Sequence, residues 1–254
     1  MTLNSSFRLD GKHILVTGAS SGIGLSICRA IIDAGGRVTG TARRQQQLSE
    51  MVRASGEGKA SSIQADLADD TGIKKIASEV EEVDGVVYAA GVSKLTPLKF
   101  VKRQDLTEVM NINYFAMVLL LSQLLKNKKI KKNNDSSIVL ISSVAQQIGT
   151  KSSLIYTGSK GAMSSAARVI ANELAPQRIR VNTIEPGMVR TDMTAEMENI
   201  LSTETIEKDR LKYPLGYGAP EDVANGAIFL LSDASRWMTG RSLTMDGGRY
   251  SLLD

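Results

Sequence analysis

The residues Thr17-Gly18-Ala19-Ser20-Ser21-Gly22-Ile23-Gly24 decide the fold of this chain of 254 residues. They follow an apolar run, His13 to Thr17, that predicts a buried strand, and they lead into a helical pattern that Gly35-Gly36 ends. A pyrophosphate can approach the backbone closely only where side chains are absent, and a helix N-terminus offers unpaired N–H groups to an anion. The turn therefore predicts a dinucleotide site with these candidate binding residues: Gly18, Ser20, Ser21, Gly22, Ile23 and Gly24.

Short β-branched runs alternate with amphipathic stretches along the rest of the chain, a pattern typical of repeated βαβ units around a parallel sheet. Strands are predicted at 13–17, 37–42, 62–65, 85–90, 138–141, 178–184 and 243–245. Helices are predicted at 25–32, 45–54, 73–83, 105–126, 156–174 and 221–231. We therefore expect an α/β protein in which residues 1–254 form a single-domain doubly wound (Rossmann) fold. Its seven-stranded parallel sheet is flanked by helices, and a variable segment lies at about 190–217.

The composition excludes several kinds of site. Hydrophobic residues make up 42% and charged residues 23% of the chain, which is typical of a soluble globular protein. One Cys and one His exclude a disulfide framework, a Cys/His zinc site and any Ser-His or Cys-His pair that does not use His13. We expect no metal, so the chemistry must come from hydroxyls, carboxylates, amides or lysines.

The charge pattern does not indicate nucleic acid. The net charge is only +4, and the densest basic cluster lies in polar sequence without the interleaved aromatic residues that would stack bases: Lys126, Lys128, Lys129, Lys131 and Lys132. We interpret it as a solvated helix end and loop. No signal peptide is visible, and the apolar run Phe115 to Leu121 is too short to span a bilayer. The chain is expected to be cytoplasmic, with no membrane partner.

The end of the second predicted strand indicates which dinucleotide binds. A protein that prefers NAD usually has Asp or Glu there, which accepts a hydrogen bond from the ribose 2′-hydroxyl. In this chain no acidic residue lies between Arg37 and Ser49. The guanidinium of Arg43 suits a 2′-phosphate, so NADP(H) is favoured over NAD(H). The alternative is that Arg43 and Arg44 only lie in solvent at a helix start, where cations are poorly placed.

A second pattern, Tyr156-x-x-x-Lys160, predicts acid–base chemistry. Residues four apart share one face of a helix, so the phenol and the ammonium converge. A free phenol has a pKa of about 10, and a nearby cation is expected to lower that pKa toward a useful range. Ser143 ends a predicted central strand upstream, at the edge where open α/β sheets bind ligands. Its hydroxyl could hold a substrate carbonyl beside the phenol.

Taken together, these residues resemble the short-chain dehydrogenase/reductase family from Gly11 to Gly248. The resemblance rests on the first Gly-rich motif, on the Tyr-Lys pair and on these further positions: Asp66, Ala90-Gly91, Asn113, Ser143, Pro186-Gly187 with Thr191, Thr239-Gly240 and Asp246-Gly247-Gly248. Within the family, the chain most resembles the 3-oxoacyl-[acyl-carrier-protein] reductases, by its length and its terminal Asp-Gly-Gly.

The resemblance implies a role for each matching position. Tyr156 would be the general acid in carbonyl reduction, Lys160 would lower its pKa and bind the nicotinamide ribose, and Ser143 would polarise the carbonyl. Asn113 would anchor a water of a proton relay, with Asn111 as its rival. The remaining cofactor contacts would come from Asp66, Leu67, Ala90, Gly91, Pro186, Gly187, Val189 and Thr191. Family members are commonly homotetramers packed through the long helices, here 105–126 and 156–174.

Two departures from the family pattern stand out. The usual Asn-Asn-Ala-Gly after the fourth strand is replaced by Tyr88-Ala89-Ala90-Gly91, which puts the bracing of the sheet in doubt there. Ser21 occupies a position that is often basic in members that prefer NADP. Outside the motifs, we interpret His13 as structural and Cys28 as a core residue.

We therefore expect an NADP(H)-dependent oxidoreductase that transfers hydride between the nicotinamide and a carbonyl or secondary alcohol, similar to 3-oxoacyl-[acyl-carrier-protein] reductases. Its partner would be a small or acyl-carrier-bound carbonyl substrate. The alternative is a dehydrogenase of a sugar, cyclic alcohol or steroid-like substrate that uses NAD(H). Apolar residues of the variable segment favour an acyl chain: Met193, Met197, Ile200 and Leu201. Gln146 and Gln147 could equally meet sugar hydroxyls.

Overall fold

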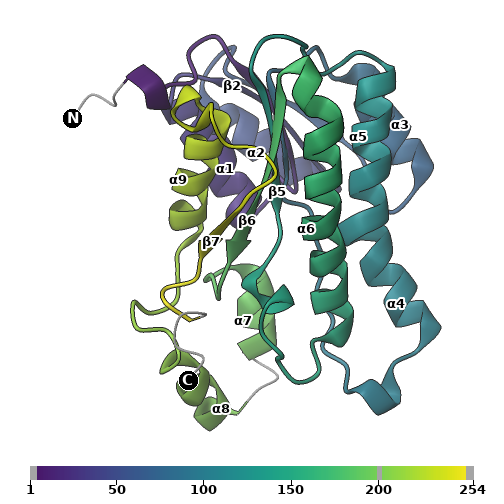
Figure 1. The fold of residues 1–254 in the computed structure, drawn as a ribbon, viewed down its shortest axis with the longest axis vertical. Coiled ribbons are helices and arrows are strands. Elements are labelled where there is room, and N and C mark those ends of the chain that lie inside the picture. The colour runs from purple at the N-terminus through teal and green to yellow at the C-terminus, as the bar shows by residue number, and fades with distance from the viewer. Residues whose placement is uncertain (1–4, 199–201, 250–254) are drawn as a thin grey trace.

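Seven parallel strands form one sheet in the computed structural model, which describes residues 5–198 and 202–249 (Figure 1). The strands are β1 (His13–Thr17), β2 (Arg37–Ala42), β3 (Ala60–Gln64), β4 (Gly85–Tyr88), β5 (Ser136–Ile141), β6 (Ile179–Pro186) and β7 (Ser242–Met245). Their order is β3-β2-β1-β4-β5-β6-β7, so the direction of winding reverses between β1 and β4. Ligands bind at such a switch point in open α/β sheets. The predicted doubly wound fold is confirmed.

Helices cover both faces of the sheet (Figure 1). One face is covered by α1 (Gly22–Asp33), α2 (Gln45–Ser55) and α9 (Pro220–Leu231). The other is covered by α3 (Asp70–Glu79), α4 (Arg103–Met110) with α5 (Ala116–Lys126), and α6 (Leu154–Leu174). Two further helices, α7 (Asp192–Glu198) and α8 (Thr203–Arg210), lie in the variable segment after β6.

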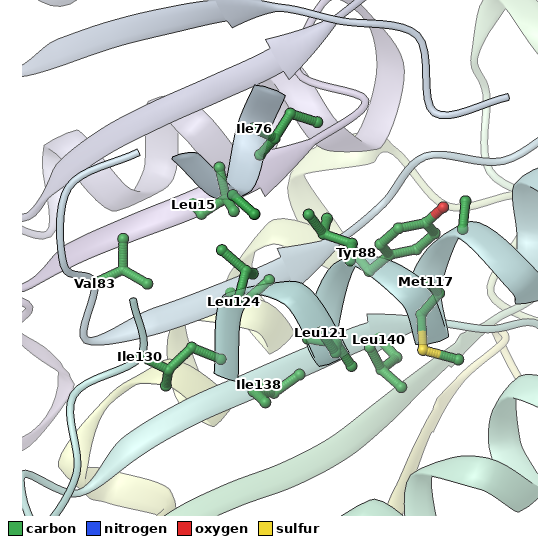
Figure 2. Packing of buried hydrophobic residues seen from close by; sticks show 14 of the residues in the cluster. Leu15, Ile76, Val83, Tyr88, Met117, Leu121, Leu124, Ile130, Ile138 and Leu140 are labelled. Carbon is green, nitrogen blue, oxygen red and sulfur yellow. The ribbon is translucent and has the colours of Figure 1, made fainter. Parts of the chain in front are cut away.

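The central strands β1, β4, β5 and β6 are buried on both sides because helices cover both faces of the sheet. Leu15 of β1 belongs to the apolar cluster on the side of α3, α5 and α6, whereas its neighbours Ile14 and Val16 belong to the cluster on the side of α1 and α9. On β4, Tyr88 faces the first of these layers and lies near Met117 and Leu140 (Figure 2). Figure 2 shows how closely the apolar side chains of this layer interdigitate.

Most predicted elements start or end one to four residues from their observed bounds, and three of these differences have a clear physical cause. The third helix begins at Asp70, not at 73, because the Asp69 side chain caps it by accepting from the Gly72 N–H at 2.8 Å. The predicted strand 85–90 ends at Tyr88, because the next two amides turn to the side chain of Thr17. The predicted helix 105–126 is interrupted by a wide π turn, Asn111–Phe115, between α4 and α5.

The helical stretch Arg103–Lys126 has apolar residues on two sides. By length and mean hydropathy alone it could cross a membrane, but 39% of the relevant window is buried inside the protein. Leu120 and Leu124 pack onto the sheet, whereas Val118 and Leu119 point outward and are about two-fifths exposed. The high mean hydropathy of this stretch therefore has two sources. One is the face that packs onto the sheet, and the other is an apolar face that is exposed to solvent.

Other residues singled out in the sequence have structural roles. His13 is buried, with one ring nitrogen 2.8 Å from the Thr39 hydroxyl, and Cys28 lies in the core, where burial raises the pKa of its thiol to about 12. The basic cluster is not solvated throughout. Lys131 pairs with the buried Asp84 at 2.8 Å, and Lys129 donates to the carbonyl of Val80 at 2.7 Å.

Candidate active site

Two adjoining cavities open at the carboxyl ends of the central strands. The larger has a volume of about 350 Å³ and extends from the Gly-rich turn after β1 to the end of β2. The smaller, of about 110 Å³, lies between the ends of β5 and β6 and helix α6. Their walls share Ile23, Gly91, Thr191 and Met193, so they form one continuous cleft. Every residue predicted to bind the cofactor lines one of them.

The Gly-rich turn shapes the larger cavity. A Cβ at Gly24 would lie 2.2 Å from the carbonyl oxygen of Gly18, so only glycine allows the turn to close on the start of α1. Gly22 has a positive φ of +52°, and a Cβ there would lie 3.3 Å from the Thr191 side chain across the cleft. The Ser21 side chain does not cap the helix that begins here. The N-terminal amides of α1 are therefore available to an anion.

Two guanidinium groups lie at the far end of the larger cavity. Arg43 and Arg44 both line it, directly after β2. Arg44 donates to the Ser21 hydroxyl at 2.6 Å and to the Ser20 hydroxyl at 3.0 Å, which draws the cation over the Gly-rich turn. This donor set fits the 2′-phosphate of NADP(H). Only Arg43 was predicted as a site residue, although the adjacent Arg in the same polar stretch was a visible signal.

The opposite wall of the larger cavity comes from residues after β3 and β4. Asp66 and Leu67 line it, and the Asp66 carboxylate accepts from the Ala68 N–H at 2.9 Å. Ala90 and Gly91 complete the wall as predicted from their small size. These residues bound the part of the cleft that could accept the adenine end of a dinucleotide.

The Ser–Tyr–Lys group lines the smaller cavity. Tyr156 and Lys160 lie one turn apart on α6, with the ammonium 5.7 Å from the centre of the phenol ring. Helix α6 lies close to the sheet because small buried residues face it, among them Ser164 and Ala167. Ser143 follows β5 and lines the same cavity as the Tyr156 phenol. The three side chains that the spacing predicted to converge do so in the structure.

Burial dominates the protonation of this group. It lowers the pKa of Lys160 to about 8, and it raises the pKa of the Tyr156 phenol above its ordinary value, against a smaller lowering by Ser143. The predicted lowering of the Tyr156 pKa by Lys160 is therefore wrong for the protein alone. The ammonium is instead engaged with the carbonyl oxygen of Ile141, to which it donates at 2.7 Å. Tyr156 is accordingly protonated at neutral pH, as a general acid must be.

Asn113 lies behind the smaller cavity and does not line it. It is fully buried, accepts from the Val92 N–H at 2.9 Å and donates to the Val92 carbonyl and to the Ser159 hydroxyl. A Cβ at Gly91 would lie 3.3 Å from Asn113 Oδ1 and 3.5 Å from Lys160 Nζ, so both side chains converge on that glycine. The rival Asn111 points elsewhere and donates to the carbonyl of Ala68 at 2.7 Å.

Other contacts brace the segment where this chain has Tyr88-Ala89 in place of the usual Asn-Asn pair of the family. The Thr17 hydroxyl accepts from the N–H groups of Ala89 and Ala90, at 3.1 Å each. The Tyr88 phenol donates to the carbonyl of Ile112 at 2.6 Å. The segment after β4 is therefore braced from β1 and from the π turn. Sequence reasoning missed both contacts, because they join residues that are far apart in the chain.

The variable segment closes one side of the cleft. Met193 of α7 lines both cavities, and Thr194 lines the smaller one. Ile200 and Leu201, together with the side chain of Met197, lie outside the described residues. Gln147 donates to the buried carboxylate of Glu185 on β6.

Comparison with known proteins gives close matches over almost the whole chain. A family model described as enoyl-(acyl carrier protein) reductase matches residues 18–249. L-xylulose reductase of Bos taurus is 35% identical over 242 residues, which cover 95% of this chain and 97% of that protein. A 3-oxoacyl-[acyl-carrier-protein] reductase of Aquifex aeolicus is 32% identical over 251 residues, covering 96% and 99%.

Solved structures give the same result. A short chain dehydrogenase/reductase family protein superposes with a TM-score of 0.87 at 30% identity, covering 96% of this chain and 100% of that one. A candidate 2-deoxy-D-gluconate 3-dehydrogenase from Agrobacterium tumefaciens, solved with bound NADP, has a TM-score of 0.86 at 28% identity and covers 98% and 100%. These proteins share a fold and a type of chemistry, whereas the substrates in their names differ.

Proposed function

Because the chain belongs to the short-chain dehydrogenase/reductase family and is an oxidoreductase of alcohol and carbonyl groups, we propose that it is an NADP(H)-dependent carbonyl reductase. One observation carries the proposal: Ser143, Tyr156 and Lys160 line a single cavity that continues into the dinucleotide cleft. A carbonyl held in that cavity would have a proton donor on its oxygen side and the cofactor on its carbon side.

The preference for NADP(H) rests on charge. Two guanidinium groups, Arg43 and Arg44, line the end of the cleft where a 2′-phosphate would lie, and the hydroxyls of Ser20 and Ser21 adjoin them. The stretch from Arg37 to Ser49 offers no carboxylate to a free ribose hydroxyl. Ser21 would thus contribute to the 2′-phosphate site through its contact with Arg44, although its own side chain is not basic. The remaining predicted residues would hold the pyrophosphate and nicotinamide.

When bound between the Gly-rich turn and the Ser–Tyr–Lys group, NADPH would supply the hydride for reduction of a carbonyl. Ser143 donates a hydrogen bond to the carbonyl oxygen and polarises it. Tyr156 gives its phenolic proton to that oxygen as the alcohol forms, and the resulting phenolate is stabilised by the nearby Lys160. A proton returns from solvent to the phenol through Lys160 and a water anchored at Asn113. Reversal of the same steps would oxidise an alcohol.

For the substrate, we propose a 3-oxoacyl thioester or a similar carbonyl compound with an apolar chain. The resemblance to a 3-oxoacyl-[acyl-carrier-protein] reductase and the apolar Met193 beside the cleft support it. A keto-sugar is the second candidate, since an L-xylulose reductase is 35% identical to this chain, against 32% for the 3-oxoacyl-[acyl-carrier-protein] reductase. NAD(H)-linked oxidation of a sugar, cyclic or steroid-like alcohol would be the corresponding alternative.

We further propose that the protein is a single domain over residues 1–254 that assembles as a homotetramer in the cytoplasm. The outward face of the helices that flank the cleft supports the assembly, because it exposes large apolar side chains: Leu106, Phe115, Val118, Leu119, Leu154 and Val169. A patch of this kind is typical of an interface between proteins.

The decisive experiment is a substrate panel. Acetoacetyl thioesters, keto-sugars and cyclic ketones are each incubated with NADPH or NADH, and the loss of dihydronicotinamide absorbance is followed. Fastest turnover of a thioester with NADPH supports the proposal, whereas fastest turnover of a keto-sugar favours the second candidate. If the protein binds NADPH but reduces none of these carbonyl compounds, the proposed reductase function is overturned.

A further inference from the structure

Tyr88 is a buried phenol at the carboxyl end of β4, directly before the segment that faces the cleft. Its side chain is fully buried beside Met117 and Leu140, and Figure 2 shows its ring at the edge of that apolar layer. The hydroxyl donates to the carbonyl oxygen of Ile112 at 2.6 Å. The resembling family usually has an asparagine at this position, so the contact is not part of the usual family motif.

The Ile112 carbonyl accepts this bond because the helix is irregular there. In a regular α-helix the N–H of Ala116 would donate to the Ile112 carbonyl. In the π turn Asn111–Phe115 that N–H donates to the carbonyl of Asn111 instead. The Tyr88 hydroxyl therefore supplies a donor to a carbonyl that the wide turn deprives of its usual partner.

The same turn carries the buried amide of the candidate proton relay. Asn113 follows Ile112 directly, and its side chain bonds to both the N–H and the carbonyl of Val92, at 2.9 Å each. Tyr88 and Val92 flank the short segment that contains Gly91, where Asn113 and Lys160 converge. The turn is thus tied to this segment at both of its ends.

We propose that Tyr88 is a positioning residue: by bonding to Ile112 it fixes the π turn and so holds Asn113 beside Gly91 and Lys160 for proton transfer. The inference rests on the proposed reductase function. It implies that loss of the Tyr88 hydroxyl slows the proton-transfer step without weakening cofactor binding, because Tyr88 lines neither cavity. Burial raises the pKa of Tyr88, so the phenol stays protonated and remains a donor at assay pH.

The kinetic test compares Tyr88→Phe, Asn113→Ala and the double variant. Tyr88→Phe is expected to lower kcat by about 10- to 100-fold with KM for NADPH unchanged, and to add nothing to the loss caused by Asn113→Ala. Ser137→Ala is the matched control, because it also removes a buried strand hydroxyl from a helix carbonyl, that of Leu230 at 2.7 Å, but on α9 and away from the cleft. Its kcat should stay within about twofold of wild type.

Two kinetic outcomes would overturn the inference: a Tyr88→Phe variant with near-normal kcat, or one whose effect adds fully to that of Asn113→Ala. A structural readout is independent of turnover. Amide hydrogen exchange at residues 111–117 should accelerate in Tyr88→Phe and stay unchanged in Ser137→Ala. If wild type reduces no carbonyl, the proposed function fails and the exchange experiment alone decides whether Tyr88 fixes the turn; equal exchange in both variants would refute it.

Discussion

The ammonium of Lys160 donates to the carbonyl oxygen of Ile141 at 2.7 Å, which ties it to the end of β5. This contact fixes the position of the cation in the cleft, with its nitrogen 5.7 Å from the centre of the Tyr156 ring. The lysine is almost fully buried, and burial lowers its pKa to about 8. Keeping the Lys160 ammonium charged therefore lowers the stability of the folded protein.

That cost gives a prediction for stability. The pKa of Lys160 falls from 10.5 to about 8 on folding, so between these pH values the unfolded chain binds more protons and the stability of wild type rises with pH. Lys160→Met should therefore raise the free energy of unfolding near pH 7 by about 1–2 kcal/mol, after the lost bond to Ile141 is counted. The gain should shrink toward pH 10 in urea unfolding experiments. Lys151→Met, at an exposed position, is the control; a less stable Lys160→Met at neutral pH contradicts the prediction.

Removal of the Tyr156 hydroxyl should separate catalysis from binding. Tyr156→Phe keeps the ring but removes the proton donor, so turnover should fall by at least about 10²-fold. NADPH affinity, followed by fluorescence titration, should change by no more than about twofold, because the other cofactor contacts remain. Near-normal turnover would mean that another group is the acid.

The pair of arginines predicts a change in cofactor preference. Arg43→Asp should raise KM for NADPH far more than KM for NADH, by about 10-fold or more, because a carboxylate repels the 2′-phosphate. Arg44→Ala should act in the same direction, since its contacts with Ser20 and Ser21 place it at the same end of the cleft.

The control for both variants is Arg53→Ala, which removes a positive charge from the exposed end of α2. It should leave the ratio of the two KM values unchanged. Equal rises for NADPH and NADH in Arg43→Asp would reject the assignment of the 2′-phosphate site.

The exposed apolar helix face predicts the assembly state. Leu119→Arg and Val169→Glu place charges at positions that are 42% and 58% exposed, so neither should disturb the core. Each should shift the proposed tetramer toward smaller species in light scattering, because a charge buried at an interface is costly. Leu211→Glu, at an 85% exposed position in the variable segment, should not. A wild-type monomer at assay concentration would contradict the expectation itself.

The parts of the fold that follow from local pattern could be predicted from the sequence. The central strands could be predicted because buried parallel strands are continuous apolar runs, such as 138–141 within β5. The π turn could not be predicted, because Asn111 to Phe115 has the same apolar spacing as the helix around it. The start of α3 was missed although Asp69 offered a visible cap.

In the candidate site, too, some features could be predicted from the sequence and others could not. The Tyr156–Lys160 spacing predicts convergence, because it depends only on helical geometry. The raised pKa of Tyr156 depends on how much protein surrounds the phenol, and the chain does not show this before it folds. The contacts of Thr17 and Tyr88 likewise depend on which strands and turns become neighbours.

One hydroxyl limits how the cofactor cleft can be redesigned. Thr17 Oγ1 receives two backbone amides at once, from Ala89 and Ala90. Valine would match the shape of the threonine, yet it would remove the acceptor of both part-buried amides, which costs up to about 1–3 kcal/mol for each. A library that varies β1 for a new cofactor should therefore keep a hydroxyl at position 17, because its loss would destabilise the segment that follows β4 rather than β1 itself.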